Sequence, residues 1–318
     1  MTWRVVLVTI GVMLLSAVDT LAATLVAGAT TRVAGPSATA PATPLYGVTI
    51  DRITGIAKVV GAEESLPERP TTRVYFDATE PASYYTAAVS QLHAVSQVMG
   101  ELLDSGDASG MTTGAFQARV EDYLGTLGPS VDIWEIGNEV NGNWTGPYAT
   151  GAARIDEAYD DVAAAGAGSA LTLFANEYGP DNCGDGSGEL TPVQYSEQYV
   201  PTAVRDGLTY VFESYYPTEC GNTYPTDAQV ATELLALHAL YPNARLGFGE
   251  VGLPRPVTRR TLATGEAVMA WAYGLDPELP YYVGGYFWWY ADQDAFKGKA
   301  RLAGALRNAF AAEASALG

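Results

Sequence analysis

Two glutamates in this chain stand at the ends of apolar segments rich in β-forming residues. Glu139 ends the segment 131–139, and Glu250 lies near the end of the segment 244–252, with Gly249 and Gly252 close by. Cleavage of a glycosidic bond needs two carboxyl groups, one that donates a proton and one that attacks or activates water. Glycines at such a position permit close backbone approach, which suits a functional strand end. The two glutamates are therefore the first candidates for chemistry.

The elements that must position them follow one repeating pattern, an apolar run and then a helical stretch. Because the runs are apolar rather than alternating, we expect strands buried on both faces. A helix over 191–205 is indicated by Thr191 as N-cap and Pro192 in the first turn. The connector 54–62 is the weakest predicted helix. The predicted strands are 46–51, 72–77, 95–104, 131–139, 170–177, 208–217, 244–252 and 280–292, and the other helices are 81–93, 113–127, 151–165, 226–240, 258–273 and 296–315.

Eight strand–helix units predict an α/β fold, a single (β/α)8 TIM barrel. A doubly wound open sheet is the alternative, but it usually has a glycine-rich phosphate turn after its first strand, and residues 51–55 do not form one. In a barrel the active site lies at the carboxyl ends of the strands. Strands four and seven lie on opposite sides of the barrel mouth, so Glu139 and Glu250 can approach to about 5–5.5 Å, the separation in retaining enzymes.

At these residues the sequence resembles clan A, the 4/7 superfamily of retaining (β/α)8 glycoside hydrolases, over residues 46–318. The resemblance implies that Glu139 is the acid/base and that Glu250 is the nucleophile. It also implies that Asn138 binds the sugar 2-hydroxyl. Arg73 is similar to the strand-two arginine that supports the nucleophile.

Aromatic positions extend the resemblance. Tyr215, which we favour over Tyr216, is similar to the strand-six tyrosine that hydrogen-bonds the nucleophile. Trp288 or Trp289 is similar to the strand-eight aromatic beneath the sugar, and alternation along a strand sends only one of them inward. Several families of the clan have a strand-six histidine where 213–214 is Glu-Ser. This departure leaves the substrate open.

A second Asn-Glu pair, Asn176-Glu177, ends the predicted fifth strand. If the predicted strands are miscounted by one, Glu177 rather than Glu139 ends strand four and would be the acid. Otherwise we expect Glu177 to line the substrate groove or to pair with an arginine. Trp144 and Tyr178 follow strand ends as well, and we include both as substrate-binding candidates because aromatic faces suit the apolar C–H faces of sugars.

The composition limits the partners. With 318 residues and 48% hydrophobic residues the chain can bury a core, which excludes a disordered protein. The net charge of −19, from 36 acidic and 17 basic residues, repels phosphates and argues against nucleic acid. Two histidines and two cysteines offer few ligands for zinc. We expect neither a metal nor a cofactor.

The first residues resemble an export signal. A short basic start precedes an apolar run over 5–18 that is shorter than the ~20 residues of a spanning helix and is followed by Asp19. We expect a cleaved signal peptide over 1–23 rather than a membrane anchor, an Ala/Thr/Pro-rich linker over 24–44 and the catalytic barrel over 45–318. The mature protein would be secreted and free of the membrane.

Export permits a disulfide between Cys183 and Cys220, the only two cysteines. They lie in the loops after predicted strands five and six, which meet on one face of a barrel. Two free buried thiols are the alternative.

The predicted function is hydrolysis of a β-linked polysaccharide or oligosaccharide by double displacement. We expect a carbohydrate substrate, with β-glucan or β-mannan favoured and internal bonds cut, and a monomeric enzyme. A cell-wall transglycosylase using the same residues is one alternative. A carbohydrate-binding barrel without catalysis is another, although it would be expected to lose one carboxylate.

Overall fold

Eight parallel strands close into a single barrel, as the sequence predicts. The computed structural model describes residues 44–179, 183, 189–297 and 301–317, so the predicted signal peptide and most of the predicted linker lie outside the described residues. The strands follow one another around the barrel in chain order. They are β1 Leu45–Ile50, β2 Thr71–Tyr75, β3 Gln97–Glu101, β4 Ile133–Gly137, β5 Gly168–Phe174, β6 Tyr210–Tyr215, β7 Arg245–Val251 and β8 Tyr282–Trp288.

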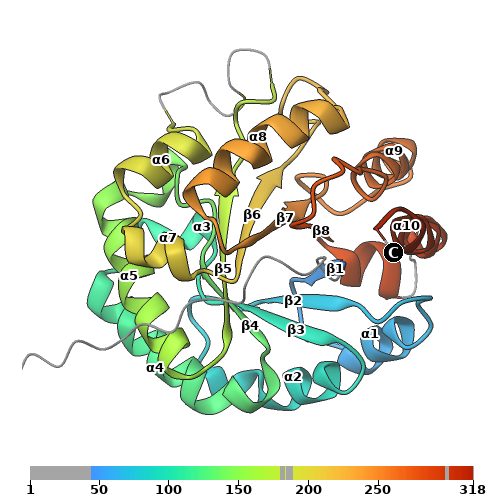
Figure 1. Ribbon diagram of the computed structural model, residues 1–318. Coiled ribbons are helices and arrows are strands. Elements are labelled where there is room, and N and C mark those ends of the chain that lie inside the picture. Colours follow the sequence, from blue (N-terminus) through green and yellow to red (C-terminus); the bar gives the residue numbers. More distant parts are fainter. Residues whose placement is uncertain (1–43, 180–182, 184–188, 298–300, 318) are drawn as a thin grey trace, which may run out of the picture. The chain divides into compact units, whose positions relative to one another are not determined.

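The helices surround the barrel (Figure 1). Among the residues that the structure describes, no helix is both long enough and apolar enough to cross a membrane. The main helices are α1 Ile56–Glu63, α2 Thr86–His93, α4 Thr113–Leu127, α5 Tyr148–Ala164, α6 Pro192–Gln198, α7 Thr202–Gly207, α8 Asp227–Leu240, α9 Leu262–Ala272 and α10 Ala303–Leu317. Shorter helical segments are η1 Ala82–Tyr84, α3 Ser105–Ala108, η2 Gly128–Ser130, η3 Asn143–Thr145 and the π-helical η4 Asp292–Phe296.

Apolar residues on both strand faces explain the continuous runs in the sequence. The larger buried cluster joins the strands to the helices, for example through Val74 and Trp134. A smaller cluster fills the barrel interior with residues from six strands, namely Leu45, Met99, Ile133, Ala170, Phe212, Val283 and Phe287. Burial of both faces is the usual condition of a parallel sheet.

Several predicted boundaries differ from those of the structure. The predicted helix 191–205 begins as expected, because Thr191 caps it and forms a capping box with Gln194. It divides into α6 and α7 because Pro201 cannot continue the helical hydrogen bonds. The predicted last helix 296–315 starts later, at Ala303, and the predicted strand 280–292 ends at Trp288.

The predicted disulfide is present. Cys183 and Cys220 are joined, and they link the loop after β5 to the loop after β6. Both loops follow strand carboxyl ends, so the bridge lies on the face of the barrel that holds the candidate site.

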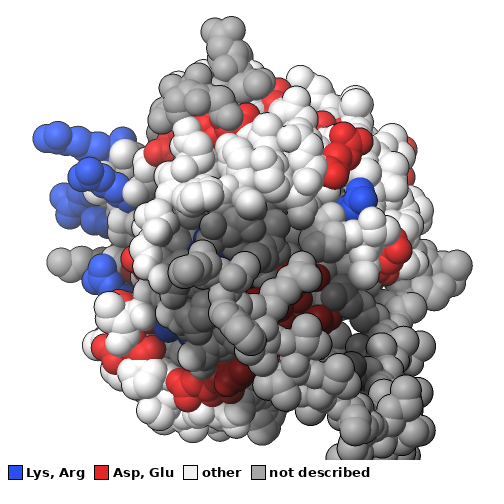
Figure 2. All heavy atoms as spheres, turned by 90° about the vertical axis from the view of Figure 1, so that its left-hand side faces the viewer, with Lys and Arg blue, Asp and Glu red and all other residues white. Residues whose placement is uncertain are grey.

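The acidic residues do not form one continuous surface. On the face drawn in Figure 2, Asp and Glu side chains form several separate groups, whereas Lys and Arg side chains gather at one side. On this face the acidic side chains are therefore dispersed rather than focused at one place.

Candidate active site

A cleft of about 520 Å³ lies at the carboxyl ends of the strands and contains both candidate carboxyl groups. A second hollow, about 750 Å³, lies at the opposite end of the barrel among the first residues of several strands, such as Leu45 and Thr71, and contains neither glutamate. The cleft is lined by Glu139, Trp144, Phe174, Tyr216, Glu219, Glu250, Pro254 and Trp289.

Two serines hold the Glu139 carboxyl group. The Ser214 hydroxyl donates to Oε1 at 2.6 Å, and the Ser105 hydroxyl donates to Oε2 at 2.7 Å. Glu139 follows β4 with φ of 46°, a left-handed conformation that is rare for a residue with a side chain. Such backbone strain is found mainly where a functional side chain must take a fixed direction.

Burial raises the pKa of Glu139 above its ordinary value. The hydrogen bonds from Ser214 and Ser105 lower it, because they stabilise the charged form, while the negative charge of Asp104 raises it. The net shift is upward. This favours a carboxyl group that holds a proton and can donate it.

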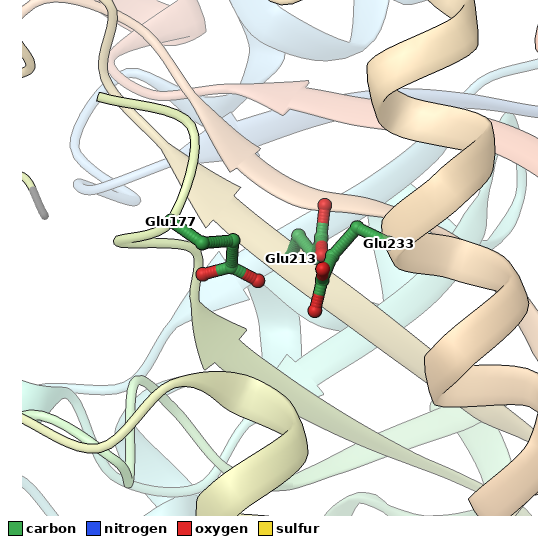
Figure 3. A group of neighbouring side chains, drawn as sticks. All are labelled: Glu177, Glu213 and Glu233. Atoms are coloured by element: carbon green, nitrogen blue, oxygen red, sulfur yellow. The ribbon is translucent and has the colours of Figure 1, made fainter. Parts of the chain in front are cut away.

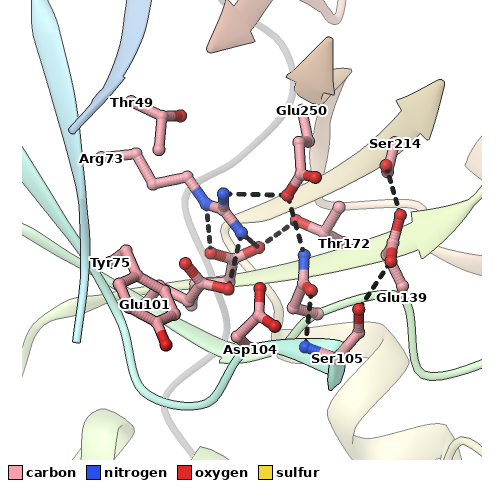
Figure 4. A network of polar contacts seen from close by, with 12 residues as sticks. Thr49, Arg73, Tyr75, Glu101, Asp104, Ser105, Glu139, Thr172, Ser214 and Glu250 are labelled. Atoms are coloured by element: carbon pink, nitrogen blue, oxygen red, sulfur yellow. Dashed lines mark hydrogen bonds and ion pairs between the residues drawn. The ribbon is translucent and has the colours of Figure 1, made fainter. Parts of the chain in front are cut away.

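Glu250 accepts hydrogen bonds from three side chains. Arg73 Nη1 donates to Oε2 at 2.9 Å, Asn138 Nδ2 donates to the same oxygen at 3.3 Å, and the Tyr216 hydroxyl donates to Oε1 at 2.6 Å. Figure 4 shows Glu250 and Arg73 facing each other, with Glu139 beside Ser214 and Ser105. The carboxylate is therefore fixed in orientation at both oxygens.

Burial raises the pKa of Glu250 to about 8. Arg73 and Tyr216 lower it, whereas the charges of Glu139 and Asp104 raise it. Glu139 and Glu250 thus oppose each other's ionisation. When the pair carries one negative charge, we place that charge on Glu250, because a guanidinium, an amide and a phenol stabilise it there, whereas only two hydroxyls face Glu139.

Arg73 on β2 is the centre of a buried ion-pair network. Its side chain is fully buried and forms ion pairs of 2.6 Å with Glu135 and 2.9 Å with both Glu101 and Glu250. Burial alone would lower the pKa of Arg73, but the three glutamates raise it well above its usual range. Glu135 is thus a buried ion-pair partner of Arg73. The Trp289 ring lies 5.0 Å from the guanidinium carbon and covers it.

Two glycines of the β7 segment allow this packing. A Cβ on Gly249 would lie 2.7 Å from both Phe212 Cβ and Thr172 Oγ1, and one on Gly252 would lie 3.1 Å from Trp289 Cβ. Gly249 is also the extra residue where the β6–β7 register shifts, since Glu213 pairs with Phe248 and Ser214 with Glu250. Such a bulge redirects the side chain that follows it. Close approach, rather than an unusual φ, explains these glycines.

The tyrosine prediction is wrong by one residue. Tyr216 donates to Glu250, whereas the Tyr215 hydroxyl donates to the Thr223 carbonyl at 3.0 Å. Tyr215 is the last residue of β6 and packs on the side away from the cleft, against Tyr178 and Trp271. Alternation along the strand therefore sends Ser214 to the site and Tyr215 away from it.

Of the two tryptophans, Trp289 lines the cleft and Trp288 does not. Trp288 is fully buried, and its indole nitrogen donates to Asp294 at 3.1 Å. Of the two alternatives, Trp289 is therefore the one in the cleft, and Trp288 is not a substrate-contact candidate. Trp144 does line the cleft, where it makes an edge-on contact with Phe174 at a ring distance of 5.2 Å.

Glu177 and Tyr178 do not line the cleft described above. The Tyr178 hydroxyl donates to Glu213 at 2.7 Å, and Glu177 lies beside Glu213 and Glu233. Their prediction as substrate-binding residues is therefore not supported by their positions. Glu213 forms no ion pair among the described residues.

Sequence reasoning missed several residues of the site. Ser105 has no recognisable motif, and Ser214 was noted only as the position where a histidine is lacking. Glu219 lines the cleft directly before Cys220, so the disulfide holds its loop. Phe174 is the last residue of β5, and its place at a strand end is the signal that could identify it as a residue of the cleft.

Comparisons with known proteins identify the fold. No protein-family model matches the chain, and no curated protein matches it. The GH10 xylanase from Bispora sp. MEY-1, solved with xylobiose, is similar with a TM-score of 0.54 and 14% identity, over 82% of this chain and 95% of that one.

Two further solved structures are similar at lower TM-scores. One is Gas2p of Saccharomyces cerevisiae in complex with laminaritriose and laminaritetraose, with a TM-score of 0.47 and 14% identity over 88% of this chain and 68% of that one. The other is the family 1 β-glucosidase from Thermotoga maritima, with a TM-score of 0.45 and 10% identity over 74% of this chain and 75% of that one. At 14% identity the likeness to the xylanase shows a shared (β/α)8 barrel fold.

Proposed function

We propose that this protein is a retaining glycoside hydrolase of clan A that cleaves a β-linked polysaccharide or oligosaccharide. One observation carries the proposal: Glu139 and Glu250 line the same cleft, and each is held by its own set of hydrogen-bond donors. The (β/α)8 fold supports it, because this fold places active sites at the carboxyl ends of the strands.

The mechanism follows from the two environments. The Glu250 carboxylate attacks the anomeric carbon while protonated Glu139 gives its proton to the leaving oxygen, so that a C–O bond forms to the enzyme and the glycosidic bond breaks. Glu139, now ionised, removes a proton from water, and the water oxygen displaces Glu250 from the anomeric carbon. Two displacements at one carbon return the original anomeric configuration.

The donors on Glu250 explain its role. Arg73 and Tyr216 orient the Glu250 carboxylate and stabilise its charged form against the effect of burial. Once the ester forms, Glu250 no longer carries a charge, so the mutual repulsion between the charged forms of Glu139 and Glu250 is relieved. That change supports the switch of Glu139 from acid to base. Asn138 lies against Glu250, where its amide could also meet the sugar 2-hydroxyl.

The cleft suits a sugar polymer. Trp289 and Trp144 offer aromatic faces, and Glu219 adds a further carboxylate that can accept hydrogen bonds from hydroxyl groups. We propose β-glucan or β-mannan as substrate, attack at internal bonds, a secreted monomer and no cofactor. The disulfide is in keeping with an exported protein.

The test is hydrolysis of β-glucans, mannans, galactans and xylans by the wild type, Glu139→Ala and Glu250→Ala, with Glu157→Ala on the exposed face of α5 as the control. We expect the wild type to cut one polymer and NMR to show that the products retain the anomeric configuration. The activity of both site variants should fall at least 1,000-fold, which corresponds to about 4 kcal/mol of transition-state stabilisation. The control should keep full activity. With an aryl glycoside, added azide should restore Glu139→Ala and give a product of retained configuration.

Three results would contradict the proposal. Inverted products would exclude the double displacement. Activity that persists in Glu139→Ala but disappears in Glu177→Ala would move the acid to the second Asn-Glu pair. Sugar binding without any turnover would favour a non-catalytic barrel, while longer products from an oligosaccharide would indicate transglycosylation by the same two glutamates.

A further inference from the structure

Three glutamates outside the cleft direct their carboxyl groups toward one another. Glu177 lies in the loop after β5, Glu213 lies on β6, and Glu233 lies on α8. One oxygen of each lies within 4.8 Å of the others. Figure 3 shows the three side chains meeting between β6 and α8. We call these three residues the glutamate cluster.

The cluster is buried and lacks balancing charge. Glu213 is fully buried, and its Oε1 has no hydrogen-bond partner, although its Oε2 accepts a bond from Tyr178. Both carboxyl oxygens of Glu177 are also buried, and the side-chain group that offers them a hydrogen bond is another carboxyl group, that of Glu233. Within the described part of the chain, the ion pairs do not include any member of the cluster.

Such an arrangement is unfavourable without a counter-charge. Burial, and then the charge of Glu233, raise the pKa of Glu213 to about 8, and burial with the charges of Glu213 and Glu233 raises that of Glu177 well above its ordinary value. Buried carboxylates need a partner charge, a proton or a metal ion. Glu213 Oε1 is thus an unpartnered, fully buried acceptor that faces two further carboxyl groups.

We propose that the glutamate cluster binds one calcium ion. Its ligands are all oxygens, which hard cations prefer. Calcium–oxygen distances of 2.3–2.6 Å allow opposite ligand oxygens to lie up to about 5.2 Å apart, whereas magnesium at 2.0–2.1 Å allows only about 4.2 Å. The three oxygens lie within 4.8 Å of one another, which is inside the span that two calcium ligands can cover.

The ion would join three elements of the fold. Glu177 belongs to the same loop as Cys183, and the disulfide ties that loop to the one that carries Glu219 at the cleft. Calcium would add a second tie, from the loop after β5 to β6 and α8. The proposal concerns stability and does not depend on the proposed function.

Calcium binding is tested on the full protein after removal of metals with a chelator. We expect isothermal titration with calcium chloride at neutral pH to give one site, and the midpoint of thermal unfolding to rise by about 5 °C at a calcium concentration 100-fold above Kd. Magnesium should produce a smaller rise. Terbium, which replaces calcium and is excited through nearby tyrosine, should luminesce when bound beside Tyr178.

Glu213→Gln and Glu233→Gln should each fold and lose the calcium response. Glu121→Gln, which removes one charge from the exposed face of α4, is the matched control and should respond like the wild type. Absence of a calcium response in the wild type would overturn the proposal and leave shared protons as the way the cluster is neutralised. An unchanged response in both cluster variants would overturn it too, because the ion would then bind elsewhere. If a variant does not fold, the wild type still tests the proposal, because bound terbium should luminesce and calcium should displace the terbium.

Discussion

The hydroxyl of Ser214 on β6 donates a 2.6 Å hydrogen bond to Oε1 of Glu139, which follows β4. The two residues lie 75 positions apart in the chain. This contact fixes the direction of a carboxyl group whose backbone is already in a left-handed conformation. It also stabilises the charged form of Glu139 and so opposes the effect of burial on its pKa.

Ser214→Ala should shift the pH dependence of the enzyme. Loss of this donor raises the pKa of Glu139, so the alkaline limb of kcat/KM should move to higher pH, and kcat should fall about tenfold, which corresponds to one hydrogen bond. The measurement is a pH–rate profile beside Ser83→Ala, an exposed control. An alkaline limb at the same pH as in the wild type would show that Ser214 does not tune Glu139.

Tyr216→Phe and Tyr215→Phe form a matched pair. Tyr216→Phe removes the hydrogen bond to Oε1 of Glu250, and we expect kcat/KM to fall about 10- to 100-fold, the cost of a bond to a charged group. Tyr215→Phe removes only the bond to the Thr223 carbonyl, so kcat/KM should stay close to that of the wild type. The reverse order of effects would contradict the assignment of Tyr216 to the nucleophile.

Arg73→Lys should reduce both activity and stability. An ammonium group cannot reproduce the fork with which Arg73 reaches Glu101, Glu135 and Glu250. We expect at least a 100-fold loss of kcat/KM, and a loss of stability of about 3 kcal/mol, because buried carboxylates lose a partner. Steady-state kinetics and urea unfolding measure the two effects. Arg52→Lys, at an exposed arginine, is the control, and equal behaviour of both variants would exclude a special role for Arg73.

The raised pKa of Glu63 predicts how the free energy of unfolding changes with pH. Its side chain is buried, with a hydrogen bond from Thr72, and burial raises its pKa from 4.5 to about 8. Between these values the unfolded chain has released the proton that the folded protein retains, so stability falls as the pH rises from 4.5 to 8 and the loss is complete above about 8.

Glu63→Gln removes this dependence because glutamine does not titrate. The free energy of unfolding of the variant relative to the wild type should therefore increase from pH 4.5 to pH 8. Urea unfolding at several pH values measures it, with the exposed neighbour Glu64→Gln as the control. A constant difference between Glu63→Gln and the wild type over this range would show that Glu63 is not protonated in the folded protein.

The sequence contains enough information to predict the barrel and its candidate carboxyl groups. Eight apolar runs separated by helical stretches allow few arrangements, because connections between parallel strands must cross over through a helix. Strand ends then define the active face, so Glu139 and Glu250 could be selected from their places in the pattern, whereas Asn138 and Arg73 are implied by the resemblance to clan A. The disulfide followed from a single pair of cysteines in loops on that face.

Which of two adjacent aromatic residues reaches the cleft could not be predicted. The last residues of β8 break the regular alternation, since Gly284, Gly285, Tyr286 and Phe287 all have positive φ. After such a run, position along the strand no longer determines the direction of Trp288 or Trp289. On β6 the alternation is regular, because the extra residue of the register shift, Gly249, lies on β7.

The sequence by itself determined the order of strands and helices, the two candidate carboxyl groups and the cysteine pair, because local patterns and composition encode them. Only the tertiary structure decided which donors face each carboxyl group and which carboxyl groups share a buried space. Contacts such as Ser214 with Glu139, or Glu177 with Glu213 and Glu233, join distant parts of the chain. These contacts depend on bulges, on left-handed residues and on the closure of the barrel. Together these features set the direction of each side chain, and a short stretch of sequence does not determine them.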